Sequence, residues 1–156
     1  MIKNEMIGGP RTVRECLKHL VEILQTAQKM VDDMVSRGIK GAATKIKTEG
    51  CPADVMESLR LIFAARDEIT NLVQHWVSLN NRGVRAWYSL SQELHIHDPC
   101  LVSAPLARAH QELLKLNPEG VVGILLIHLG WRLRDVKTEL EVTYNEAVHR
   151  HHKLRN

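Results

Sequence analysis

The side chains best suited to chemistry gather in one short segment, Leu94-His95-Ile96-His97-Asp98-Pro99-Cys100. Its imidazoles, carboxylate and thiol are all groups that bind zinc. However, His-x-His spacing points both rings to one side only in an extended chain, and no CxxC or HxxxH group supplies further ligands. We therefore expect a polar loop at a helix end, with no metal and no cofactor, and keep zinc binding as the alternative.

A second pair with catalytic potential is Cys16 and His19, which stand three residues apart and can be neighbours on a helix. Nothing around them suggests a pocket-forming loop or an oxyanion hole. The phosphate-loop, dinucleotide, esterase and zincin motifs are all absent from the sequence. We therefore predict that the chain is not an enzyme and keep an enzyme with an unrecognised site as the least favoured alternative.

The elements that carry these residues are predicted to be helical. The chain has 156 residues, of which 44% are hydrophobic and 25% charged, and its few aromatics leave Leu, Val, Ile, Ala and Met to form the core. Three widely spaced cysteines and an N-terminus without an apolar core of signal-peptide length favour a cytoplasmic protein. The longest apolar stretch, 121–131, is about half the length needed to span a bilayer, so we expect no membrane association.

The first predicted helix starts at Thr12, because Thr12 and Glu15 have the spacing of a capping box. Its apolar positions recur every three or four residues, and Gly38 offers a C-terminal stop. These positions are Val13, Leu17, Leu20, Leu24, Ala27, Val31 and Met34. Residues 38–50 contain three glycines and three lysines against a single acid, which predicts a mobile basic connector.

Four further helices follow from start and stop signals. Pro52 and Gly83 bound the second helix, a third runs over 84–95, and Ser103 caps a fourth over 104–116. The fifth starts at 117–119, and since 121–131 is apolar on nearly every side, we expect this part to be central in the domain. Gly123 and Gly130 share one face, where a neighbouring helix could approach closely.

The predicted fold is therefore an all-α bundle of about five helices, three of them long and amphipathic with heptad-like seams. Residues 1–11 are expected to form a flexible lead-in, 12–150 a single helical domain and 151–156 a basic tail. The seam of the last helix continues past the stretch that looks internally buried. An exposed seam of this kind would need a partner.

The leading functional hypothesis is a non-enzymatic module that self-associates or binds a helical protein partner. The expected contact residues lie on the last helix: Leu133, Val136, Leu140 and Tyr144. The alternative is a protein that binds duplex or structured RNA through basic side chains of the connector and the tail. These phosphate-binding candidates are Lys40, Lys45, Lys47, Arg150, Lys153 and Arg155.

Overall fold

The computed structural model describes residues 12–50, 52–83, 89–117, 119 and 123–155, the last five by their backbone alone. Four helices contain most of these residues: α1 (Val13–Glu49), α2 (Pro52–Arg82), α4 (Ser103–Leu116) and α5 (Gly123–Arg155). A seven-residue helix, α3 (Leu90–Ile96), and a 3-10 turn, η2 (Pro99–Val102), precede α4. The described residues form no strand, so the all-α prediction is confirmed. A bundle of about five helices with heptad-like seams is not confirmed, because only four of the described helices have at least 14 residues and α3 has seven.

The predicted start of α1 is confirmed in detail. Thr12 Oγ1 accepts the backbone N–H of Glu15 at 3.1 Å, and the Glu15 carboxylate accepts the backbone N–H of Thr12 at 3.0 Å. This reciprocal pair satisfies two of the backbone donors that every helix start leaves unpaired. All seven apolar positions that the spacing singled out in α1 are buried.

The predicted connector at 38–50 is wrong, because α1 continues through it to Glu49. Gly38 and Gly41 do not stop the helix but face its neighbours. A Cβ atom on Gly41 would lie 2.5 Å from the backbone carbonyl oxygen of Leu116, at the end of α4. Gly41 therefore lets the end of α4 approach the backbone of α1, and Gly38 leaves room for Ile62 of α2. The helix ends at Gly50, whose φ of 66° is the left-handed conformation of a C-terminal cap.

The second predicted helix is confirmed at both ends, with Pro52 in its first turn and Gly83 at φ 70° after its last residue. The third predicted helix ran over 84–95, and the structure describes α3 from Leu90. Residues 84–88 lie outside the described residues. The predicted cap of the fourth is wrong, since Ser103 is the first helical residue and not the cap. In place of a capping side chain, the 3-10 turn η2 leads directly into the first turn of α4.

The inward side of α4 carries the buried side chains Leu106, Leu113 and Leu116. The predicted start of the fifth helix falls earlier than the structure has it. Asn117 is the C-cap of α4, and α5 begins at Gly123. Residues 118 and 120–122 lie outside the described residues.

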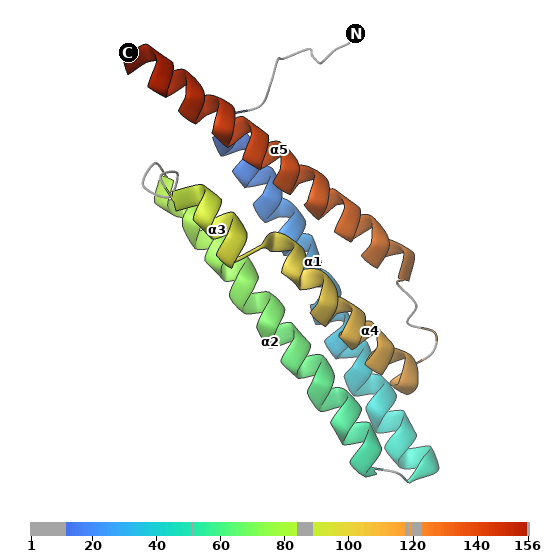
Figure 1. The fold of residues 1–156 in the computed structure, drawn as a ribbon. Coiled ribbons are helices and arrows are strands. Elements are labelled where there is room, and N and C mark those ends of the chain that lie inside the picture. Colours follow the sequence, from blue (N-terminus) through green and yellow to red (C-terminus); the bar gives the residue numbers. More distant parts are fainter. Residues whose placement is uncertain (1–11, 51, 84–88, 118, 120–122, 156) are drawn as a thin grey trace.

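The helices pack along one another in an elongated arrangement (Figure 1). The helices α1 and α2 run antiparallel, and α4 lies against both. The first half of α1 packs on α5, with Cys16 Sγ 3.8 Å from Thr143 Oγ1. The C-terminal part of α5 extends beyond the start of α1. In the described part of the chain, no helix is long and apolar enough to cross a membrane.

The position of α5 overturns the expectation that residues 121–131 are central for the described part of this stretch, 123–131. Among the described residues, α5 contacts α1, α4, η2 and α3, and its buried side carries Leu129, Leu133, Val136 and Leu140. The opposite side of its first turns therefore remains in contact with solvent, with Ile124 72% and Trp131 51% exposed. Apolar composition on all sides marked this segment as buried, whereas the structure covers only one of its faces.

An ion pair holds α5 against η2, with Lys137 Nζ 2.9 Å from Asp98 Oδ2. Partial burial favours neutral Asp98, but hydrogen bonds from Lys137 and from the Cys100 backbone N–H outweigh it, so the pKa of Asp98 lies below its usual value. Burial likewise disfavours charged Lys137, but the hydrogen bond to Asp98 outweighs it and raises the pKa of Lys137. Both groups are therefore charged at neutral pH.

Candidate interaction surface

The residues predicted to bind a partner are mostly inside the chain's own core. Leu133, Val136 and Leu140 are 0%, 3% and 0% exposed. Tyr144 is partly buried and lines a groove of about 220 Å³ between α3 and α5. The premise of an exposed seam is therefore wrong, because α1 packs along this part of α5.

An apolar surface does exist on α5, but on its other side. Ile124, Ile127 and Trp131 follow one another at spacings of three and four residues, which places them on one helix face. Leu133 follows Ile124 by nine residues, a rotation of about 180° relative to it at 3.6 residues per turn. The three side chains therefore project away from the core. They are 72%, 54% and 51% exposed.

The His128 ring belongs to the same surface and packs edge-on against Trp131, with the ring centroids 5.3 Å apart. We call the set of Ile124, Ile127, His128 and Trp131 the outer patch of α5. Arg132 and Asp135 follow it along the helix, and both line a shallow hollow of about 280 Å³ between α5 and α1. The outer patch is thus an apolar surface with a polar border, the composition of a protein contact site.

The two groups of predicted phosphate-binding residues lie at opposite ends of the molecule. Lys45 stands 29 residues along α1 from Cys16, a distance of about 44 Å by helix rise. Arg150 lies seven residues beyond Thr143 in the opposite direction, about 10 Å further. Since Cys16 and Thr143 are in contact, roughly 50 Å separates the two groups.

The lysines of α1 also do not form one cluster. Lys40 and Lys47 are seven residues apart and share an exposed face, whereas Lys45 lies on another side of the helix. Lys45 Nζ is 3.6 Å from a Glu49 carboxylate oxygen, which offsets part of its charge. Arg150 is exposed, and the side chains of Lys153 and Arg155 lie outside the described residues. The structure therefore separates the α1 group from the α5 group, and on α1 it places Lys45 apart from Lys40 and Lys47.

No protein-family model, curated protein or solved structure matches this chain. Its functional assignment therefore depends on its own surfaces and side-chain clusters.

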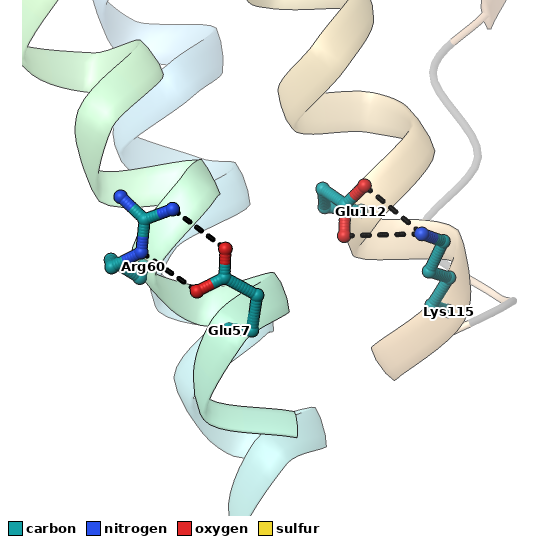
Figure 2. A network of polar contacts seen from close by, with 4 residues as sticks. All are labelled: Glu57, Arg60, Glu112 and Lys115. Atoms are coloured by element: carbon teal, nitrogen blue, oxygen red, sulfur yellow. Dashed lines mark hydrogen bonds and ion pairs between the residues drawn. The ribbon is translucent and has the colours of Figure 1, made fainter. Parts of the chain in front are cut away.

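The surfaces of α2 and α4 carry balanced charges. Figure 2 shows two of their ion pairs, Glu57 with Arg60 on α2 and Glu112 with Lys115 on α4. The hydrogen bond that Arg60 donates lowers the pKa of Glu57. Such pairs between neighbouring turns neutralise each other and contribute little to stability at an exposed surface. These two pairs therefore leave no net charge that would attract a charged partner.

The Cys16 and His19 pair has no catalytic setting. Cys16 is fully buried, so a substrate cannot reach its thiol. The His19 ring instead faces Glu22 on the same helix, with 3.8 Å between Nδ1 and Oε1.

A cluster that the sequence did not reveal lies where α2 meets α3. The His75 and Glu93 side chains are in direct contact through Nε2 and Oε2, and the His97 ring stacks on His75 with 3.8 Å between centroids. Two imidazoles and one carboxylate therefore meet, with one ligand atom from each residue within 4.8 Å of the other two. Only His97 belongs to the segment that the sequence singled out, because His75 comes from another helix. Glu93 and His97, four residues apart, were the one local signal.

Proposed function

We propose that this protein is a non-enzymatic helical interaction module that pairs with a second copy of itself through the outer patch of α5. The observation that carries the proposal is the exposure of Ile124, Ile127 and Trp131 on the face opposite the buried side of the same helix. Burial of apolar surface stabilises association by about 25 cal/mol per Å². Tryptophan side chains are frequent among the residues that dominate binding energies.

The spacing of the outer patch suits a second copy. When two α5 helices lie antiparallel about a two-fold axis between Ile127 and His128, Trp131 of each helix lies opposite Ile124 of the other. The same surface thus serves both partners, as closed two-fold symmetry requires. The patch extends seven residues along α5, a length of about 10 Å. A patch of this length covers much less than the roughly 800 Å² that each partner contributes to a standard interface. We therefore expect a weak dimer with a dissociation constant in the micromolar range.

Sedimentation velocity from about 1 µM to about 1 mM tests this proposal. The mean mass should rise with concentration toward that of a dimer. Trp131→Glu should leave a monomer with unchanged helix content by circular dichroism, because the new charge would be desolvated against Ile124 of the second copy in the dimer.

The matched control is Val142→Glu. Val142 is 51% exposed on the same face of α5 but lies beyond the paired segment. Its substitution adds the same charge to the same helix and should leave the dimer intact. A wild-type protein that stays monomeric at the highest concentration refutes the proposal.

A further inference from the structure

We propose that His75, Glu93 and His97 bind a divalent transition-metal cation, with Zn²⁺ the best match to the three side chains. This site is independent of the outer patch of α5. Its ligands come from two elements: His75 lies on α2, while Glu93 lies on α3 and His97 is the C-cap of that helix. A bound ion would therefore join α3 to α2.

The ligand set favours zinc over the hard cations. Two imidazole nitrogens and one carboxylate oxygen are the three protein ligands of many zinc sites, with a fourth position left for water or another group. Ca²⁺ and Mg²⁺ prefer sites built of oxygen atoms, and this cluster offers oxygen from Glu93 alone. The chemistry of the three side chains thus selects a cation of the zinc type.

The distances fit such an ion after small side-chain movements. Ligands about 2.0 to 2.1 Å from a tetrahedral zinc ion lie roughly 3.3 Å from one another. The ligand atoms of the cluster are already within 4.8 Å, and the rings of His75 and His97 are tilted by only 36°. Because the lone pair of each nitrogen lies in its ring plane, the two stacked rings must rotate further apart before both nitrogens point at one ion. The contact between His75 and Glu93 would open to admit it.

The backbone around the cluster is held in place by a buried side chain. The indole N–H of Trp76 donates to the backbone carbonyl of His97 at 2.7 Å, and Trp76 is fully buried. The backbone N–H of His97 donates to the carbonyl of Glu93 at 2.8 Å, which fixes the two ligands of α3 relative to each other. The edge of the His75 ring packs against Trp76, with 6.1 Å between centroids. Ligands positioned in this way lose little freedom when an ion binds.

The side chains are also accessible to an ion from solvent. The side chains of His75 and Glu93 are 28% and 18% exposed, and His97 is partly buried. A hydrogen-bonded His75–Glu93 pair without metal affinity is the competing account of the same contact. The two accounts differ in whether His97 contributes to the binding of an ion.

Isothermal titration of the full chain with ZnCl₂, after removal of metal with a chelator, tests the site. Because His149, His151 and His152 in the C-terminal region could bind zinc by themselves, the titration uses a background in which all three are replaced by Gln. We expect one Zn²⁺ per chain, and with Co²⁺ the visible absorption of a tetrahedral site. Thermal unfolding at zinc concentrations about a hundredfold above the dissociation constant should show a Tm higher by about 5 to 10 °C.

Three variants and one control locate the site. His75→Ala, His97→Ala and Glu93→Gln should each weaken zinc binding by about tenfold or more, and Glu93→Gln does so without loss of side-chain volume. His95→Ala removes an exposed histidine of the same segment and should leave the affinity unchanged. The proposal is overturned by a dissociation constant above about 0.1 mM, or by a His97→Ala protein that binds as tightly as its parent.

Discussion

At the scale of single residues, Gly41 shows how a side chain of one hydrogen atom can determine packing. The end of α4 lies so close that a Cβ atom on Gly41 would be 2.5 Å from the carbonyl oxygen of Leu116. A backbone atom cannot move aside as the end of a flexible side chain can. Gly41→Ala should therefore lower the free energy of unfolding by about 1 to 3 kcal/mol, although alanine is the better helix former.

Gly130→Ala is the matched control, since its Cβ atom would meet nothing closer than Ser103 Oγ at 3.8 Å. There the helix propensity of alanine should act alone and raise stability by about 0.5 to 1 kcal/mol. Urea denaturation of both variants measures the difference. Two variants that change stability in the same direction would show that α4 does not press on Gly41. The close approach expected at Gly123 and Gly130 thus occurs at Gly41 instead, because sequence shows which face a glycine occupies but not which neighbour arrives there.

The candidate zinc ligands could not be predicted as a group for a related reason. Glu93 and His97 are four residues apart, and this spacing is visible in the sequence. His75 joins them only because α2 and α3 fold onto each other, a contact that local spacing does not encode. Capping, by contrast, depends on residues three apart. The sequence therefore predicted the pair of Thr12 and Glu15, and the structure confirms its hydrogen bonds.

At the scale of elements, a substitution in α1 can test whether residues 38–50 are helical or form a connector. Thr44 lies in the middle of this segment, exposed, with its hydroxyl donating to the carbonyl of Lys40 at 3.1 Å. Thr44→Pro should cost about 3 kcal/mol of stability, because proline removes a helical hydrogen bond and clashes with the preceding turn. Thr44→Ala, the control, should be neutral or slightly stabilising. Thermal unfolding distinguishes the two variants. A Thr44→Pro protein as stable as the wild type would indicate that residues 38–50 form a connector and not a helix.

Starts and stops of helices were predictable where one residue has one physical role. Pro52 in a first turn and Gly83 after a last turn are of this kind. The stop expected at Gly38 was wrong because a glycine inside a helix can also serve packing, and the two roles look alike in sequence. For the same reason, the sequence did not predict which side of the first turns of α5 is buried. An apolar face turned to solvent and one turned to the core have the same composition.

At the scale of the whole molecule, the elongated shape determines what the basic residues can do. The spacing of apolar residues predicted which face of α1 is buried, but the relative position of α5 depends on contacts among α1, α4 and η2 that the sequence pattern does not show. Only that position reveals that Lys40 and Lys47 lie far from Arg150, because Cys16 near the start of α1 contacts Thr143 of α5. A nucleic acid that touched both ends would have to span roughly 50 Å, about 15 base pairs of duplex DNA.

The final prediction concerns binding of a duplex of about ten base pairs, which is too short to reach both ends. Each end offers at most three of the predicted cations, so the slope of log affinity against log salt should not exceed about 2.7 in magnitude. Replacing Lys40, Lys45 and Lys47 by Gln should remove the contribution of one end and leave helix content by circular dichroism unchanged. Fluorescence anisotropy between about 50 and 200 mM salt measures both quantities.

A slope steeper than about four in magnitude for that short duplex would require one continuous basic surface, contrary to the separation of the two ends. Added salt should not weaken self-association through the outer patch. Its contacts are apolar, so the dimer should persist across the same salt range while any phosphate contact weakens. Measuring both on the same preparation separates the two proposals: we expect a salt-resistant dimer with salt-sensitive, weak duplex binding.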